Sequence, residues 1–292
     1  MEYKDWLMLV TIHQERNITK AAERLYTTQP ALTYRLQHLE KMFGTAIVMR
    51  SKKGVEFTSQ GEYLVQYAKK MLVELEKTKD YVNNMDQTVK GSLRLGVSSV
   101  FARYKLPSVL KNFLAFYPDV DINLKTGWSV EINHMLHKEE VHLGIVRGDY
   151  AWHGEKSLLC EETLCIASTK EIRLEELPQL PRINYGTDQT LMNLIQDWWQ
   201  DSYKDPPSIT MDVDRIDTCK EMVLHGLGYA ILPSICLEND DHLHIYKLRS
   251  KNNTLITRKT WLIYRESSLQ LSIVKAFVEF MEKNAKPEFI HQ

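Results

Sequence analysis

A stretch of basic and polar residues near the N-terminus has the composition needed to recognise DNA. Between Arg16 and Lys53 the chain carries eight basic and only two acidic residues, a net charge of +6, whereas the whole chain of 292 residues carries −1. Glutamine, threonine and arginine within this stretch can hydrogen-bond base edges or phosphate oxygens. A basic segment in a near-neutral protein therefore favours contact with nucleic acid.

A second group of polar residues follows predicted strands in the C-terminal part and could bind an anion. In open α/β folds, ligands lie beyond the carboxyl ends of strands, beside helix N-termini. Hydroxyls and cations at such places favour a carboxylate. We therefore predict effector contacts at Ser98, Ser99, Trp128, Ser129, Arg147 and Tyr185, with Arg258 or Lys259 near a later strand as a second cation. The plainer alternatives stay open: a serine can be only a helix cap, and an arginine can form a surface ion pair.

Other chemistry finds little support. The chain lacks GxSxG, HExxH and phosphate-loop motifs, and Gly226-x-Gly228 lies between a helix and a strand, the reverse of a dinucleotide loop. The spacing of His134, His137 and His142 suits a solvated face. The four cysteines match no zinc pattern, so we expect buried, reduced thiols. We predict no enzyme, no metal and no cofactor.

Three helices are predicted to carry the first group. Apolar spacing predicts a helix ending near Arg16, a short helix over 20–25 capped by Thr19, and a third over 29–43. Thr28 caps the third helix, and Gly44 ends it. Short helix, tight turn and longer helix form a helix-turn-helix plan, although an ordinary helical hairpin would read the same way. Residues 46–58 then predict a β-hairpin with Arg50, Lys52 and Lys53 at its basic tip.

The first sixty residues contain an ordered motif: Thr19-x-Ala21-Ala22-x-x-Leu25, then Gln29-Pro30-Ala31-Leu32-Thr33, Leu39-Glu40, Arg50 and Thr58-x-x-Gly61. This motif resembles the N-terminus of LysR-type transcriptional regulators. The resemblance implies DNA contacts at Gln29, Pro30, Thr33, Tyr34 and Arg50. Tyr34 departs from the basic residue common there. The full set of predicted DNA contacts is Thr19, Thr28, Gln29, Pro30, Thr33, Tyr34, Arg35, Arg50, Lys52 and Lys53.

A long helix is predicted after Ser59. Apolar residues recur there in steps of four and three through Met85, with Thr78 as a polar member. Such a narrow seam favours pairing of two helices, although packing within one chain is the alternative. The predicted dimer contacts are Leu64, Ala68, Met71, Leu75 and Val82. A two-fold pair of heads would read an imperfect inverted repeat in double-stranded DNA.

Strand and helix patterns alternate from residue 91 onward and predict parallel α/β structure. Strands are expected at 92–98, 120–124, 141–146, 162–167, 182–185, 208–213, 229–232 and 259–264, and helices at 103–117, 129–137, 188–203, 217–225 and 269–284. This half is similar to the two-lobed, periplasmic-binding-type effector domain of LysR-type proteins. The resemblance implies effector contacts at Ser98, Ser99 and Val100 and at Trp128 and Ser129. His225-Gly226-Leu227-Gly228-Tyr229 matches a glycine turn common in that family.

The predicted fold is an N-terminal winged helix-turn-helix, a linker helix and a two-lobed α/β domain. The expected domains are 1–58, 59–90 and 91–292, with lobe I at about 91–161 and 266–292 and lobe II at about 162–265. The resemblance also implies a small organic-acid effector, citrate being the specific candidate, and a tetramer. We expect a cytoplasmic protein, since no signal sequence or membrane span is apparent. A solute-binding protein or a ligand-independent DNA-binding protein are the rivals.

Overall fold

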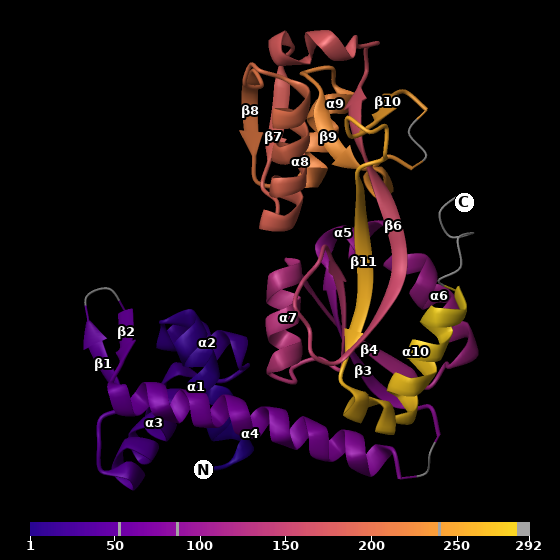
Figure 1. Ribbon diagram of the computed structural model, residues 1–292. Coiled ribbons are helices and arrows are strands. Elements are labelled where there is room, and N and C mark those ends of the chain that lie inside the picture. Colours follow the sequence, from indigo (N-terminus) through magenta and orange to yellow (C-terminus); the bar gives the residue numbers. More distant parts are fainter. Residues whose placement is uncertain (52–53, 86–87, 239–240, 285–292) are drawn as a thin grey trace. The chain divides into compact units, whose positions relative to one another are not determined.

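The computed structural model describes residues 1–51, 54–85, 88–238 and 241–284. The chain divides into two compact units, Met1–Asn83 and Asn84–Gln292 (Figure 1). The long linker helix belongs to the first unit, so the predicted domain boundaries at 58 and 90 stay a prediction. None of the helices in these ranges is long and apolar enough to span a membrane.

The first unit contains four helices and a hairpin. Its elements are α1 (Tyr3–Glu15), α2 (Ile18–Arg24), α3 (Gln29–Phe43), β1 (Val48–Ser51), β2 (Gly54–Phe57) and α4 (Ser59–Asn83). The predicted range of α3 is confirmed: Thr28 caps it with its hydroxyl on the Ala31 N–H, and Gly44 ends it in the left-handed conformation at φ 65°. Apolar side chains of all four helices and the hairpin form one core.

The cap of α2 differs from the prediction. We expected Thr19 to cap a helix beginning at residue 20. Instead, the side chain of Asn17 accepts the Lys20 N–H at 3.1 Å, and α2 begins at Ile18. Asparagine and threonine are both good caps, and the tertiary position of Ile18 in the core selects the earlier start.

The second unit is built on long strands shared by two lobes. Its strands are β3 (Gly91–Ser98), β4 (Val120–Gly127), β5 (Leu143–Arg147), β6 (Glu155–Ser168), β7 (Arg182–Tyr185), β8 (Ile209–Val213), β9 (Ala230–Pro233), β10 (His244–Lys247) and β11 (Thr257–Tyr264). The main sheet has the order β10-β6-β11-β5-β3-β4, and β9 also pairs with β6. Figure 1 shows β6 and β11 running from one lobe into the other.

Helices cover the sheets of this unit. They are α5 (Ser99–Tyr104), α6 (Leu106–Phe116), α7 (Ser129–His137), α8 (Gln189–Ser202), α9 (Ile216–Leu224) and α10 (Ser272–Asn284), with 3₁₀ turns at Leu174–Gln179, Ser234–Cys236 and Glu266–Gln270. The predicted helix over 103–117 is wrong as one helix, because α5 and α6 are separate. Pro107 has no N–H to donate to the carbonyl of Arg103, so a continuous helix cannot form there.

Each of the two lobes is stabilised by its own hydrophobic packing. In lobe I, α6 and α10 pack on one face of the β3-containing sheet, with Phe113 and Phe277 in edge-to-face contact at 4.9 Å between ring centroids. α7 packs on the other side of that sheet. In lobe II, α8 and α9 pack against β6, β7 and β9. Parallel pairing of β3 with β4 and β5, and of β7 with β8, confirms the predicted α/β class.

The four cysteines are free thiols, as expected. Cys165, Cys219 and Cys236 are buried and Cys160 is partly buried. Burial raises the pKa of Cys165 to about 11 and the pKa values of Cys219 and Cys236 to about 12.

Candidate functional site

The polar side of α3 is the first candidate surface. Tyr34 is 73% exposed, and Pro30 is also exposed. The Gln29 side-chain amide donates to the Thr33 hydroxyl at 2.8 Å, so the two side chains lie together one turn apart on this side of the helix. Amide, hydroxyl and phenol groups on one helix face can contact base edges and phosphates together.

Arg35 has a partner inside its own unit. Its Nε donates to Asp5 at 2.5 Å and its Nη2 to Glu2 at 3.1 Å, and Asp5 is buried. These carboxylates raise the pKa of Arg35, above all through the hydrogen bond to Asp5. The pair ties α1 to α3. A contact between Arg35 and DNA stays a prediction, but it would have to share a guanidinium that already has two carboxylate partners.

The hairpin after α3 is held by residues of the N-terminal motif. Glu40 accepts the Ile47 and Val48 backbone N–H groups at 2.9 and 3.3 Å. The Thr58 hydroxyl donates to the Ala46 carbonyl at 2.7 Å. Gly61 cannot carry a side chain, because a Cβ there would lie 2.1 Å from the Ile47 carbonyl oxygen. The motif therefore fixes the wing beside α3.

The remaining predicted DNA contacts lie on α2, at the start of α3 and in the hairpin. Thr19 is exposed on α2 and Thr28 is exposed at the start of α3. Arg50 lies in β1, which pairs with β2 in antiparallel register. Lys52 and Lys53 lie outside the described residues.

The predicted dimer seam divides into two parts. Leu64 and Ala68 are buried in the core of their own unit, where α4 packs on α1, so for these two residues the alternative of packing within one chain holds. Met71 and Leu75 are half-buried and Val82 is 55% exposed. Met85 lies beyond the end of α4 and cannot extend the helical seam.

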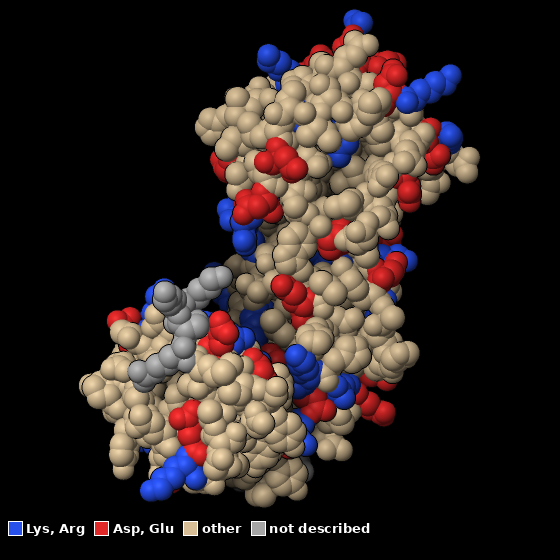
Figure 2. Space-filling model, turned by 90° about the vertical axis from the view of Figure 1, so that its left-hand side faces the viewer, with Lys and Arg blue, Asp and Glu red and all other residues tan. Residues whose placement is uncertain are grey.

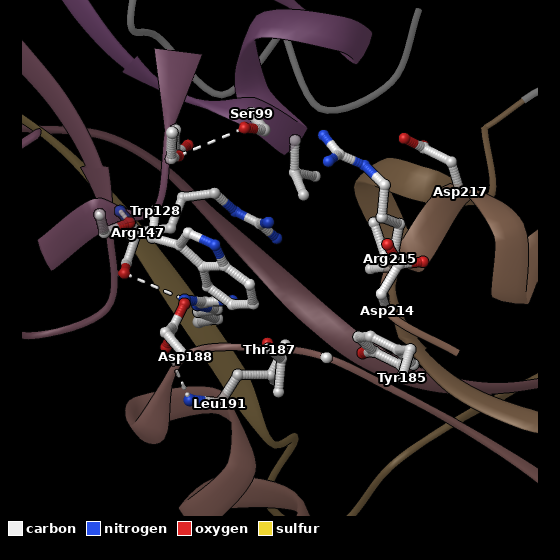
Figure 3. Close-up of a pocket in the computed structure, with 17 residues that line it drawn as sticks. Ser99, Trp128, Arg147, Tyr185, Thr187, Asp188, Leu191, Asp214, Arg215 and Asp217 are labelled. Atoms are coloured by element: carbon white, nitrogen blue, oxygen red, sulfur yellow. Dashed lines mark hydrogen bonds and ion pairs between the residues drawn. The ribbon is translucent and has the colours of Figure 1, made fainter. Parts of the chain in front are cut away.

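A pocket in the second unit brings together the second predicted group. All eight predicted effector contacts line it, and its volume is about 110 Å³. β3, β4 and β5 contribute the residues at their carboxyl ends, β7 and the start of α8 face them, and Arg258 comes from β11 (Figure 3). We call this the interlobe pocket, because lobe I and lobe II each supply part of its lining.

Arg147 forms a buried ion pair at one side of the interlobe pocket. Its Nε donates to Glu162 Oε1 at 2.9 Å, and its Nη2 contacts the same oxygen. The two side chains are only 3% and 6% exposed. Burial alone would lower the pKa of Arg147, but the charge of Glu162 raises it. Arg147 therefore stays protonated, and Glu162 balances its positive charge before any ligand binds.

Arg258 contacts residues of both lobes at the same pocket. Its Nη2 donates to the Arg147 carbonyl at 3.0 Å and contacts Asp188. Asp188 also caps α8 by accepting the Leu191 N–H at 3.1 Å. Burial would raise the pKa of Asp188, but the positive charge of Arg258 and hydrogen bonds from Thr190 and Leu191 lower it. The Nε of Arg258 is buried without a partner among the described residues.

The hydroxyl groups of the pocket differ in availability. Ser98 Oγ is buried and has no partner in the described part of the chain, whereas Ser99 donates weakly to the Gly127 carbonyl at 3.3 Å. Ser129 accepts the Arg147 N–H at 3.0 Å, and Tyr185 donates to the Ile231 carbonyl at 2.9 Å. Tyr185 thus offers its ring to the pocket, and Ser98 and Ser99 offer hydroxyls.

Sequence reasoning missed the lining that follows β8. Asp214 and Arg215 line the pocket from the segment between β8 and α9, and Asp217 lines it from the first turn of α9. Arg215 is exposed, and no carboxylate of the described residues pairs with it. Figure 3 shows its guanidinium pointing toward the Ser99 side of the pocket. The rule that found the other residues would have found Arg215, because it follows the carboxyl end of strand β8.

The lining is balanced in charge. Three arginines face three aspartates, and two of the arginines have carboxylate partners. Within the described ranges no group of three histidine, cysteine or acidic side chains could hold a metal ion. The arrangement can bind a small polar molecule whose acidic group meets Arg215 and whose body lies against Trp128 and Tyr185.

Comparison with known proteins covers both units. Residues 3–62 match the family of bacterial regulatory helix-turn-helix proteins of the lysR type, and residues 86–286 match the LysR substrate binding domain. The chain is 47% identical to the uncharacterized HTH-type transcriptional regulator YraN of Bacillus subtilis, over 97% of this chain and 98% of that one. It is 39% identical to YkuM of the same organism, over 97% of each chain.

Solved structures agree on the fold. The crystal structure of CbnR, a LysR family transcriptional regulator, superposes with a TM-score of 0.72 at 19% identity and covers 98% of this chain and 100% of that one. Full-length CbnR in complex with its target DNA gives a TM-score of 0.71 at 19% identity, covering 97% and 100%. The relatives are regulators and not enzymes. The chain therefore belongs to the LysR family of DNA-binding transcriptional regulators, with an N-terminal helix-turn-helix and a C-terminal effector-binding domain.

Proposed function

We propose that this regulator binds an imperfect inverted repeat in double-stranded DNA as a dimer in the cytoplasm. The polar side of α3, where Tyr34 is exposed and Gln29 and Thr33 are half-buried, supports base reading by these three residues. Met71, Leu75 and Val82 remain available on α4 for pairing, since Leu64 and Ala68 serve the core. Family likeness adds a tetramer. The structure of a related regulator on its target DNA supports the DNA partner.

We further propose that a small organic acid in the interlobe pocket modulates DNA binding. The observation that carries this proposal is that Arg215, which has no carboxylate partner among the described residues, points toward the Ser99 side of a pocket that Ser98 and Arg258 also line. Ser98 Oγ and Arg258 Nε are buried there without a hydrogen-bond partner in the described part of the chain. A ligand carboxylate at Arg215 would contact both lobes at once and so favour one arrangement of them. Citrate is the specific candidate from family likeness. The balanced lining favours an acid with one or two carboxylates over this trianion.

The DNA proposal is tested by gel-shift titration of the full-length protein on an inverted-repeat duplex and on a random duplex. Affinity should fall steeply as salt rises. Gln29→Ala should lose affinity for the specific duplex by about 1–3 kcal/mol and leave random binding unchanged. Lys52→Ala should weaken both duplexes alike and lower the salt slope by about one. Equal losses from both substitutions on both duplexes would exclude α3 as the reading helix.

The effector proposal is tested by thermal shift of the full-length protein with acetate, succinate and citrate. At least one acid should raise the melting temperature, and Arg215→Gln should abolish that rise. Arg173→Gln is the matched control, because Arg173 is 82% exposed in lobe II and lies outside the pocket lining. No stabilisation by any of the three acids, or equal stabilisation of both variants, would contradict an anion at Arg215.

A further inference from the structure

Lobe II contains a second pocket that the proposed function does not use. It lies where β7 meets α8 and the segment after α8, and its volume is about 390 Å³. Small-molecule sites commonly have volumes of a few hundred Å³. We call it the lobe II pocket. Its principal lining residues are Arg182, Met192, Ile195, Trp199, Tyr203 and Pro206.

Arg182 is a buried cation without a counter-charge. The residue is 7% exposed, and its Nε is buried with no hydrogen-bond partner in the described part of the chain. No described carboxylate lies within ion-pair distance of its guanidinium. Burial lowers the pKa of Arg182, although arginine stays protonated. This contrasts with Arg147 and Arg258, which are equally buried but paired with Glu162 and Asp188.

The backbone of β7 does not require an arginine at this position. The Arg182 N–H donates to the Ser208 carbonyl at 2.8 Å, a bond that any residue other than proline would make. Burying an unpaired charge is costly, and apolar side chains of similar volume are usually tolerated or better. Within the described ranges the guanidinium has a compensating contact with Trp199, whose ring centre lies 5.4 Å from the guanidinium carbon.

Aromatic and aliphatic side chains form much of the pocket wall. Trp199 and Tyr203 lie at a tilt with ring centroids 4.6 Å apart, beside methionine, isoleucine and proline side chains. The uncharged polar members of the lining are Asn184, Thr187, Gln196 and Gln200. Lys204 and Asp205 at the exposed rim oppose each other in sign. In Figure 2 the charged side chains on the upper lobe are of both signs and scattered. Attraction of an anion here therefore depends on Arg182.

We propose that the lobe II pocket binds a small aromatic monocarboxylate, with the carboxylate on Arg182 and the ring against Trp199 and Tyr203. One unpaired guanidinium matches one carboxylate, and its planar fork can bind both oxygens. The lobe II pocket shares Tyr185 and Thr187 with the interlobe pocket, but its cation is different. The proposed second site is therefore distinguished by Arg182, which does not line the interlobe pocket.

The probe is phenylacetate, with uncharged phenylacetamide as its near-isosteric control, titrated into the full-length protein by isothermal calorimetry. Phenylacetate should bind at one site per chain that survives Arg215→Gln. At that site phenylacetamide should bind at least tenfold more weakly, since a charge-assisted hydrogen bond is lost. Arg182→Met should weaken phenylacetate roughly tenfold or more. Arg182→Lys should fall between wild type and Arg182→Met, because it keeps the charge but not the fork.

Arg173→Met is the matched control and should bind phenylacetate as the wild type does. Far-ultraviolet circular dichroism and the melting temperature check that each variant folds, and Arg182→Met should melt no lower than wild type, since it removes an unpaired buried charge. Equal affinity of Arg182→Met and Arg173→Met for phenylacetate, equal binding of acid and amide, or no binding of phenylacetate to the wild type would each overturn the proposal.

Discussion

The polar face of α3 and the interlobe pocket hold their functional groups in opposite ways. Tyr34 is mostly in water, and Gln29 bonds only its helical neighbour Thr33. Arg147 and Arg258 are out of water and bound to carboxylates from other strands and helices. A surface that reads DNA can thus change its side chains with little effect on folding, whereas the pocket cannot. Specificity and stability are separable in α3 and coupled in the pocket.

The largest expected effect comes from the pocket's most buried pair. Glu162→Gln should destabilise the protein by about 3–5 kcal/mol, because Arg147 keeps its charge and loses its compensation. Chemical denaturation followed by tryptophan fluorescence measures this loss. The double variant Arg147→Met, Glu162→Met is the control and should recover most of it. A loss under about 1 kcal/mol in the single variant would make the pocket as tolerant as α3 and remove the contrast.

The contribution of the second ion pair, Arg258 with Asp188, should be lost in acid. The folded state lowers the pKa of Asp188, so its contribution is complete above the unfolded value of about 3.9 and disappears as pH falls through the folded pKa. Wild type should therefore lose more stability than Asp188→Asn between pH 5 and pH 2.5. The effect should be smaller than for Glu162, because Asp188 is 11% exposed and has further donors. Parallel stability curves would show that the pair contributes nothing.

The start of α3 lies between the two extremes. Thr28→Ala should cost about 1 kcal/mol, because the Ala31 N–H loses its cap. Thr28→Ser keeps a hydroxyl and should stay close to wild type. Measured by the same denaturation assay, a Thr28→Ala cost as large as that of Glu162→Gln would show that α3 is not the tolerant region proposed here.

The smallest change in stability is expected on the outer face of α3. Tyr34→Ala should alter the free energy of unfolding by less than about 0.5 kcal/mol, since the side chain is largely exposed. Its affinity for specific DNA, measured by fluorescence anisotropy, should fall while affinity for random DNA holds. Tyr26→Ala, at a side chain 99% exposed in the turn before α3, is a matched aromatic control for stability.

Local signals explain what could be predicted from the sequence. The bounds of α3 follow from Thr28 and Pro30 at its start and from Gly44 at its end. Each of these residues acts on the backbone beside it, so the signal can be read locally in the sequence. Six of the pocket's eight predicted residues follow from the rule that ligands lie beyond strand ends, Val100 follows from family likeness, and Arg258 was predicted as a second cation. All eight line one pocket. That they bind an effector stays a proposal.

Non-local pairing explains what could not be predicted. Arg35 hydrogen-bonds Asp5, which is thirty residues away in the sequence, and no local pattern near Arg35 predicts this pair. The spacing of Leu64 fits both a heptad seam between two chains and the core of its own chain. Only the position of α1, against which Leu64 is buried, decides between the two. β6 extends back to Glu155 because it pairs with β11, although its own residues there do not alternate. The segment holding β10 carried no strong strand signal at all.

The burial of the thiols has a practical consequence for following this protein in solution. A thiol whose pKa is near 11 or 12 has almost no thiolate at neutral pH, so Cys165, Cys219 and Cys236 should react very slowly with maleimides. Cysteines introduced on each lobe could then carry fluorescent dyes without removal of these three, once the partly buried Cys160 is replaced. Energy transfer between such dyes would follow movement of the lobes directly as an acid is added.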